Sequence, residues 1–309
     1  MIRFDVLGVG ENSVDHVYRL PHLPGDGPAS KIRIAAHARR AGGQVATTLS
    51  ACAALGLSAA YAGVFGEDAD GRFARVALEQ SGVDLRHALT RQAPNRYAVI
   101  LVAAGSGERI VLWDRDAAMS MRPDEVTPAM VSAARLVHVD AVDEAVSIHV
   151  ARMARDAGVP VTSDIDAVTD RTRELMAAVT VPVFAEEVPA ALTGEPDLER
   201  ALRVLRREHD GLLFVTRGAK GAVLLAGDQF YEQPSFPVQP VDTTGAGDVF
   251  RAGVIYGVLR GDAPEAVLRF ATAAAALSCT REGALGSGPT LAEVNELLNA
   301  GATSTAPTR

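Results

Sequence analysis

A repeated alternation between short apolar runs and helical patterns is the feature that most constrains this fold. The apolar runs, which read as strands, lie at residues 4–9, 59–65, 136–139, 159–163, 181–184, 212–216 and 222–225. Helical patterns alternate with them or follow them, at residues 45–55, 70–81, 145–157, 246–259 and 264–278. Continuous apolar strands are typical of sheets covered on both faces, and strand–helix repeats pair in parallel. We therefore predict an α/β protein with three α/β/α layers and a mostly parallel central sheet.

Two segments, at residues 13–41 and 95–115, interrupt this rhythm. Both are strand-like, and the second turns back on itself around a Gly-Ser-Gly sequence. We predict that the two segments pair into a small second sheet that projects from the main body as a lid. We expect residues 1–309 to form a single domain that carries this lid.

Charge and composition argue against several classes of protein. The 309 residues carry a formal net charge of −8, whereas binding to nucleic acid or to an anionic membrane requires clustered positive charge. The two cysteines, Cys52 and Cys279, make neither a metal motif nor a disulfide framework. The first residues lack the apolar core of a signal peptide, and no apolar run approaches the ~20 residues of a membrane helix. We expect a soluble, cytoplasmic protein that binds neither nucleic acid nor membranes.

Residues 241–250 carry the clearest chemical signal. They read Val-Asp-Thr-Thr-Gly-Ala-Gly-Asp-Val-Phe, a turn of small residues that opens directly into an apolar helix. The first amides of a helix lack internal partners and the helix dipole is positive there, so Gly245, Ala246 and Gly247 are candidates for an anion hole. Asp248 in the first turn can accept a proton from a hydroxyl that attacks a phosphoryl group. Spacing alone leaves open that Asp248 only caps the helix, and the helix terminus would favour its ionised form and make it a weak base.

The same segment resembles the carboxy-terminal signature of the ribokinase/PfkB carbohydrate kinases. The match is Asp242-Thr-Thr-Gly-Ala-Gly-Asp248, followed by Val-Phe and then by Gly253, and the wider resemblance runs from about residue 6 to residue 289. It implies a ribokinase-like fold in which Asp248 is the catalytic base and the Gly-Ala-Gly before it is the anion hole. It also implies transfer of the γ-phosphoryl group of ATP to a hydroxyl of a sugar or sugar derivative, with Mg²⁺ as cofactor.

Five further positions resemble the substrate-binding residues of that family. Asp15, in Gly-Glu-Asn-Ser-Val-Asp, looks like the aspartate that binds sugar hydroxyls after the first strand. Gly42-Gly43-Gln-Val-Ala-Thr47 is similar to the di-glycine signature beside the substrate, and Asp140 lies where relatives place a polar sugar contact. Many members have asparagine where this chain has Thr47, which is a shorter donor and acceptor. The resemblance therefore implies a sugar substrate without naming the sugar.

The nucleotide-binding loop also has a counterpart. Thr216-Arg-Gly218-Ala-Lys-Gly221 is similar to the turn that holds the nucleotide in the family, and the nucleotide is expected to lie beneath the helices near Ala276. The resemblance therefore implies that these four residues, which come from two distant segments, contact ATP.

A monovalent cation site is implied by a third loop. Residues 280–287 resemble the loop that binds this cation in potassium-activated members, together with two residues of the signature segment. We expect K⁺ to be held by Asp242, Thr244, Gly283 and Ser287.

The magnesium-binding segment departs from the family pattern. Many members carry Asn-x-x-Glu ten residues before a Leu-Thr-Gly sequence, where it organises the water around Mg²⁺. The corresponding residues here are Ala185 and Val188, and neither can bind a hydrated cation. Glu186 and Glu187 lie between them and are the candidate replacements, although such carboxylates are more often solvated surface charge.

Two alternative functions stay open. The first is a nucleoside kinase on the same fold, although the few aromatic residues offer no obvious base-stacking pair. The second is a non-catalytic sugar or nucleotide sensor, which the departure at the magnesium segment favours. Lys31 or Arg33 in the lid is a candidate for holding an anionic group of the substrate. Lid edges often pair in this family, so we also expect a homodimer formed through the lid.

Overall fold

The large sheet forms the middle layer of the protein. The structure, a computed structural model, describes residues 3–25, 31–106 and 108–303. Strands of the large sheet follow the spatial order β14-β13-β12-β11-β10-β9-β1-β4. Their bounds are β1 Phe4–Val9, β4 Ala59–Ala62, β9 Ala134–Val139, β10 Val161–Ile165, β11 Val181–Ala185, β12 Leu213–Thr216, β13 Ala222–Ala226 and β14 Gln229–Gln233. All pairs from β4 to β12 are parallel and the two edge pairs at β13 and β14 are antiparallel, so the predicted mostly parallel sheet is confirmed.

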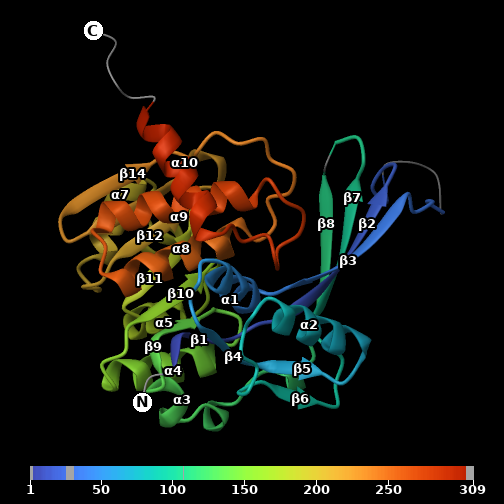
Figure 1. The fold of residues 1–309 in the computed structure, drawn as a ribbon, viewed down its shortest axis with the longest axis horizontal. Coiled ribbons are helices and arrows are strands. Elements are labelled where there is room, and N and C mark those ends of the chain that lie inside the picture. The colour runs from blue at the N-terminus through green and yellow to red at the C-terminus, as the bar shows by residue number, and fades with distance from the viewer. Residues whose placement is uncertain (1–2, 26–30, 107, 304–309) are drawn as a thin grey trace.

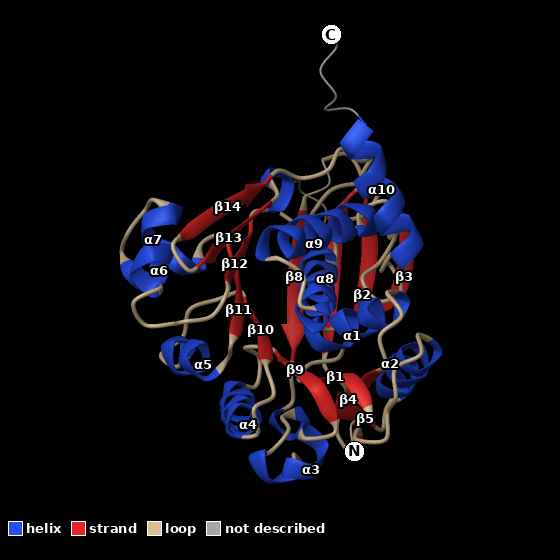
Figure 2. Ribbon diagram, turned by 60° about the vertical axis from the view of Figure 1, so that its left-hand side comes forward, coloured by secondary structure: helices blue, strands red, loops and turns tan. Residues whose placement is uncertain are grey.

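Helices cover both faces of this sheet, which gives the three predicted layers (Figure 2). One face carries α3 Pro128–Val131, α4 Glu144–Asp156, α5 Thr172–Ala178, α6 Val188–Thr193 and α7 Leu198–Leu205. The other carries α1 Gln44–Ala54, α2 Ala69–Gln80, α8 Ala246–Arg260, α9 Pro264–Ser278 and α10 Leu291–Thr303. Single 3-10 turns lie at Ala117–Met119, Pro123–Glu125 and Gly218–Lys220. Within the described residues, no helix is long and apolar enough to cross a membrane.

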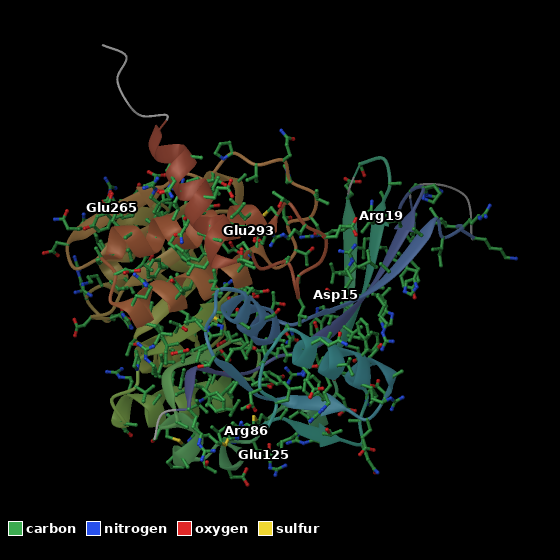
Figure 3. The ribbon with its side chains drawn as sticks, in the orientation of Figure 1. Asp15, Arg19, Arg86, Glu125, Glu265 and Glu293 are labelled. Carbon is green, nitrogen blue, oxygen red and sulfur yellow. The ribbon has the colours of Figure 1, made fainter. Side chains whose placement is uncertain are left out.

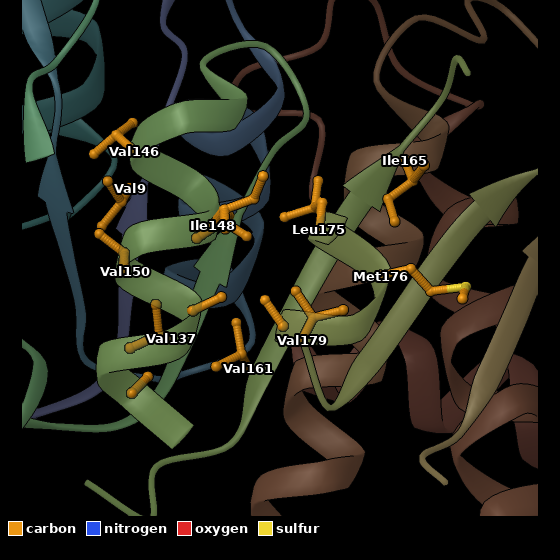
Figure 4. Close-up of a cluster of buried hydrophobic side chains, with 14 of the residues drawn as sticks. Val9, Val137, Val146, Ile148, Val150, Val161, Ile165, Leu175, Met176 and Val179 are labelled. Atoms are coloured by element: carbon orange, nitrogen blue, oxygen red, sulfur yellow. The ribbon is translucent and has the colours of Figure 1, made fainter. Parts of the chain in front are cut away.

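The core explains why the strands read as continuous apolar runs. Side chains from both faces of a strand meet helices, so no position of the run can be polar without cost. Figure 4 shows one such layer, in which Ile148 and Val150 of α4 and Leu175 of α5 lie against Val137 and Val161 of the sheet. All five are fully buried. Burial of such side chains contributes roughly 1.5–3 kcal/mol each to the free energy of folding.

A small four-stranded sheet projects from the body (Figure 1). Its order is β3-β2-β7-β8, with bounds β2 Ser13–Leu20, β3 Ala36–Gly42, β7 Tyr97–Ala103 and β8 Arg109–Asp114. A separate two-stranded sheet joins β5 Val64–Gly66 to β6 Leu89–Arg91. Apart from Gly42, the last residue of β3, the four strands lie inside the two segments that interrupt the strand–helix rhythm. Residues 26–30 and 107 of those segments lie outside the described residues. Within the strand-like segment 13–41, β3 begins only at Ala36, where its pairing with Arg19 of β2 starts.

The sheet order also fixes where a ligand can bind. β1 has β4 on one side and β9 on the other, so the chain winds away from β1 in both directions. Ligands of open parallel sheets bind beyond the carboxyl ends of the strands at such a switch point. A binding site is therefore expected at this edge of the sheet, which is formed by the loops after β1, β9 and β10 and by the start of α8.

The close packing of α8 on α9 supplies a stability test. An ideal Cβ built on Gly253 of α8 would lie 2.5 Å from the Cα atom of Ala271 on α9. Gly253→Ala should lower the free energy of unfolding, because overpacking costs about 1–3 kcal/mol. This cost should exceed the ~1 kcal/mol by which alanine is favoured over glycine in a helix. Urea unfolding measures this change. Gly105→Ala, whose methyl group meets no atom within 4 Å, is the control, and equal stability of the two variants would contradict the close helix contact.

Candidate active site

The turn before α8 leaves backbone amides free at the predicted anion hole. Gly245 caps the helix with φ 78°, and a Cβ there would lie 2.8 Å from the Cβ of Ala284. Both the left-handed backbone and this close approach require glycine. Among the described residues, the amides of Gly247 and Asp248 have no hydrogen-bond acceptor. Two free N–H groups at the positive end of a 15-residue helix are suited to binding a phosphoryl oxygen.

Asp248 lies in the first turn of α8, next to these amides, and its side chain is 14% exposed. Burial raises the pKa of this carboxyl well above its usual range, and the nearby Asp164 raises it further, whereas Arg251 opposes the change. The expectation that the start of the helix lowers the pKa of Asp248 and makes it a weak base is therefore wrong. Loss of hydration and a like charge outweigh the helix dipole here, so Asp248 is a stronger base than an exposed aspartate.

Acidic side chains gather beyond the carboxyl ends of the central strands. Glu11 follows β1, Asp140 follows β9, and Asp164 and Asp166 lie at the end of β10. Glu11 is buried and forms an ion pair of 3.1 Å with Arg115. Asp166 accepts a hydrogen bond of 2.8 Å from Gln44. The cluster therefore lies at the switch point that the sheet order indicates.

Asp140 has a different place from the one that the sequence predicts. It is fully buried, and its carboxylate accepts hydrogen bonds from the amides of Glu11 (2.6 Å) and Val142 (3.0 Å). Burial and then the charge of Glu11 raise its pKa to about 7. With no exposed surface, the side chain fixes the loop after β1 and does not line a cavity in this conformation.

Of the other predicted substrate residues, only Asp15 lines a cavity of about 760 Å³ between the small sheet and the body, and Gly42, Gly43 and Thr47 are not part of its lining. Asp15 lines it at the base of the small sheet (Figure 3). Gly42 passes beside Asp15, because a Cβ there would lie 3.4 Å from the Asp15 carboxylate. Gly43 has φ 99°, and a Cβ on it would lie 2.4 Å from the Cα of Asn12. Thr47 is buried on α1 with no partner for its hydroxyl, and its methyl group lies 3.2 Å from a Cβ built on Gly245.

A second cavity, of about 650 Å³, contains the predicted nucleotide residues together. Thr216, Gly218, Gly221 and Ala276 all line it. So do Ala246 and Gly247 of the anion hole. The two cavities share Pro240 and Thr243, so they meet beside the anion hole. A phosphate donor in the second cavity could therefore reach an acceptor in the first.

The predicted cation ligands also lie together, but an arginine contacts them. Oδ1 of Asp242 accepts hydrogen bonds from the hydroxyl (2.7 Å) and the amide (3.0 Å) of Thr244. Oδ2 accepts from the amide of Gly283 (3.0 Å) and from Nη1 of Arg40 (3.1 Å). Ser287 in the same loop donates its hydroxyl to the carbonyl of Ala284 at 2.7 Å. Both oxygens of Asp242 are thus engaged, and a guanidinium already supplies positive charge there.

The candidate replacements at the magnesium segment lie at the junction of β11 and α6. Ala185 ends β11 and Val188 begins α6. Glu186 between them forms ion pairs with Lys220 at 2.9 Å and with Arg217 at 3.7 Å. Glu187 caps α6 without a side-chain hydrogen bond. Within the described ranges, no three His, Cys, Asp or Glu side chains form a group that could hold a metal ion.

Sequence reasoning missed Glu11, Asp164 and Arg251. Asp164 follows an apolar run directly, and the end of a parallel strand is where site residues collect. Arg251 interrupts the apolar helix α8 three residues after Asp248, so the two residues lie on the same face of the helix. Both signals were present in the sequence. Only the structure shows that the two side chains are bonded to each other.

Comparison with known proteins agrees with this arrangement. The chain matches the model of the pfkB family of carbohydrate kinases over residues 5–291. It is 33% identical to an ATP-dependent ribose-1-phosphate kinase of Halopiger xanaduensis over 297 aligned residues. The alignment covers 95% of this chain and 98% of the relative. It is 31% identical over 269 residues to a ribokinase of Bacillus subtilis, which covers 84% and 87%.

Solved structures have the same fold. The structure of Arabidopsis thaliana ribokinase complexed with ribose and ATP matches with a TM-score of 0.86 and 28% identity, over 96% of this chain and 99% of that one. Ribokinase of Thermotoga maritima matches with a TM-score of 0.84 and 22% identity, over 96% and 100%. The family match covers nearly the whole chain, including the α8 segment and both cavities. The chain therefore belongs to the pfkB family of carbohydrate kinases, which are phosphotransferases with an alcohol group as acceptor.

Proposed function

We propose that this protein transfers the γ-phosphoryl group of ATP to a hydroxyl of a sugar or sugar derivative, with Asp248 as the base. The observation that carries the proposal is the start of α8: the amides of Gly247 and Asp248 have no acceptor among the described residues, and Gly247 lines the second cavity, which shares Pro240 and Thr243 with the first. The relatives named as sugar kinases and the structure of a relative with ribose and ATP support the same reaction.

In this reaction the acceptor lies in the first cavity, near Asp15, and ATP lies in the second. Asp248 takes the proton from the acceptor hydroxyl as the hydroxyl oxygen attacks the γ-phosphorus. The bond between the γ-phosphorus and the β–γ bridging oxygen breaks, and ADP leaves. The amides of Gly247 and Asp248 donate hydrogen bonds to the oxygens of the phosphoryl group in transit. Because this transition state spreads charge over several oxygens, positioning and charge stabilisation supply most of the catalysis. The small sheet acts as the lid, and its approach to the body would exclude water that could otherwise hydrolyse ATP.

Magnesium enters this proposal through the nucleotide. Mg²⁺ neutralises charge on the phosphates of ATP, and it is usually bound through those phosphates, water and one or two carboxylates. Glu186 is paired with Lys220 and Arg217, so in this conformation it is not free to take part. We therefore assign the magnesium mainly to the phosphates and water.

The first cavity also has features that suit an anionic acceptor. Arg19, Arg40 and Arg109 line it together with Asp15, and Figure 3 shows Arg19 farther along the small sheet than Asp15. Arg40 is paired with Asp242 and Glu282, whereas no ion pair engages Arg19 or Arg109 within the described residues. Lys31 and Arg33 do not line this cavity. The acceptor panel below therefore includes sugar phosphates and sugar acids.

Asp248→Asn should reduce turnover by at least ~10², the usual contribution of a general base, while ATP still binds. The measurement is release of ADP, with Mg²⁺, across ketoses, aldoses, sugar phosphates, sugar acids and nucleosides. If one class of acceptor stimulates ADP release and the variant abolishes this stimulation, the kinase function is supported and the acceptor class is identified. Stimulation by a nucleoside would favour the alternative of a nucleoside kinase. Binding without stimulated turnover by any acceptor would favour the sensor. Full activity of Asp248→Asn would sink the assignment of the base.

For the monovalent cation, we propose that Arg40 supplies the positive charge that K⁺ provides in potassium-activated members. The wild-type rate should then be similar in KCl and in choline chloride at one ionic strength. Arg40→Met leaves Asp242 without this partner, so its rate should rise with K⁺ but not with choline. Strong activation of the wild type by K⁺ would instead mean that the cation displaces Arg40 and binds at Asp242, Thr244, Gly283 and Ser287.

We propose further that two copies pair through the lid. β8 is an edge strand with exposed apolar side chains from Ile110 to Trp113, and Leu112 is 55% exposed. Such edges invite strand pairing unless they are covered. Sedimentation velocity should show a dimer for the wild type and a monomer for Leu112→Asp. Val76→Asp, a similarly exposed apolar site on α2 (49%), is the control and should remain dimeric; a monomeric wild type would refute the pairing.

A further inference from the structure

Arg251 is a buried arginine placed between two carboxylates. It lies on α8, one helical turn after Asp248, and is 4% exposed. Nη2 of Arg251 donates a hydrogen bond to Oδ1 of Asp164, which is 1% exposed at the end of β10. Nη1 of Arg251 lies 3.9 Å from Oδ1 of Asp248. The guanidinium of Arg251 is thus hydrogen-bonded to Asp164. It is too far from Asp248 for a hydrogen bond but close enough for their charges to interact.

The guanidinium also lies directly under the anion hole. A Cβ built on Gly247 would lie 2.6 Å from Nη1 of Arg251. Nη1 therefore occupies space that any other residue at position 247 would take with its side chain. The positive charge is consequently close to the amide that receives the phosphoryl oxygen, and to the carboxylate that receives the proton.

The surroundings make this charge the main opposing influence on the base. From α8 Asp248 faces Arg251, from the end of β10 it faces Asp164 and Asp166, and from the loop after β1 it faces Glu11. Three of these groups are acidic and raise the pKa of Asp248 in addition to burial, whereas Arg251 lowers it.

Charged neighbours also act on Asp164, the carboxylate that is bonded to Arg251. Burial raises the pKa of Asp164, and Arg251 opposes this change while Asp166 and Asp140 add to it. His138 on β9 also faces Arg251, and burial and this charge lower its pKa to about 3. The histidine is therefore neutral at pH 7 and adds no charge to the cluster.

We propose that Arg251 is a positioning residue that Asp164 anchors beside the base, and that its charge keeps Asp248 in the ionised form that accepts the proton. This inference rests on the proposed function, because it assigns a role to Asp248 as base. It goes beyond that function in naming the pair that sets the pH range of the reaction. A purely structural role, in which the ion pair only joins α8 to β10, would lower activity equally at every pH.

The acid limb of the pH–rate profile distinguishes the two roles. Asp248 must be unprotonated to act, so activity falls as pH drops through its pKa in the folded enzyme. Arg251→Met removes the stabilising charge, and the limb should move to higher pH by about 1–3 units, with activity returning at alkaline pH. Asp164→Asn removes a like charge but keeps an acceptor for Arg251, so the limb should move to lower pH.

Three further variants test whether the charge of Arg251 sets the position of the acid limb. Arg251→Lys keeps the positive charge and should keep the limb near its wild-type position even if turnover falls. In the double variant Asp164→Asn, Arg251→Met the two opposite charges are both absent, so the limb should return toward the wild-type position. Arg260→Met removes an arginine from the exposed end of the same helix, where it pairs with Asp262 at 3.2 Å, and should leave the profile unchanged.

The outcomes separate this inference from the proposed function. Each variant is first checked for cooperative thermal unfolding, and Arg251→Lys and Asp164→Asn carry the test if Arg251→Met does not fold. Limbs that move in opposite directions for Arg251→Met and Asp164→Asn support the proposal. Unmoved limbs with uniformly lower rates would overturn it, even while Asp248→Asn is inactive. An active Asp248→Asn would instead overturn the role of the base itself.

Discussion

Strands β1, β9 and β10 pair in parallel with helices packed on both faces, and the position of the site depends on this arrangement. Side chains along the strands are buried, so only the strand ends can carry polar groups that reach a ligand. At the carboxyl ends lie Glu11, Asp140 and Asp164, and the start of α8 approaches the same edge. The location of the chemistry is therefore a consequence of how the sheet is covered.

The site concentrates charge where the protein is least hydrated. An isolated buried carboxylate is costly, and a buried ion pair seldom stabilises a protein overall. Asp164 and Arg251 nevertheless pair out of contact with solvent, and Asp248 lies beside them. This arrangement makes sense as a functional one, because a base of raised pKa is useful only if it is still ionised at working pH. A neighbouring acid raises its proton affinity, and a neighbouring guanidinium limits that rise.

The predictable part of the site was contiguous in sequence. Gly245 and Asp248 lie within one short segment whose conformation is dictated locally, by glycine at a positive φ and by the free amides of a helix start. Thr216 and Gly221 belong to another such segment and line the second cavity as expected. By contrast, the exposure of Asp140 depended on where the loop after β1 falls. Its carboxylate accepts hydrogen bonds from the amide of Glu11 in that loop and from the amide of Val142 in its own loop after β9. Burial of this kind has no signature within a single segment.

The sequence by itself determined the α/β class, the small second sheet and the glycine turn that starts α8 with its aspartate, because periodicity, glycine placement and helix starts act over a few residues. Tertiary structure decided the rest. It raised the proton affinity of Asp248 against the expectation from its helix, because burial and Asp164 act across space. It brought Arg251 to Asp164 and Arg40 to Asp242, pairs separated by 87 and 202 positions. Electrostatic energies depend on distance in space and on hydration, and a linear sequence specifies neither until the chain has folded.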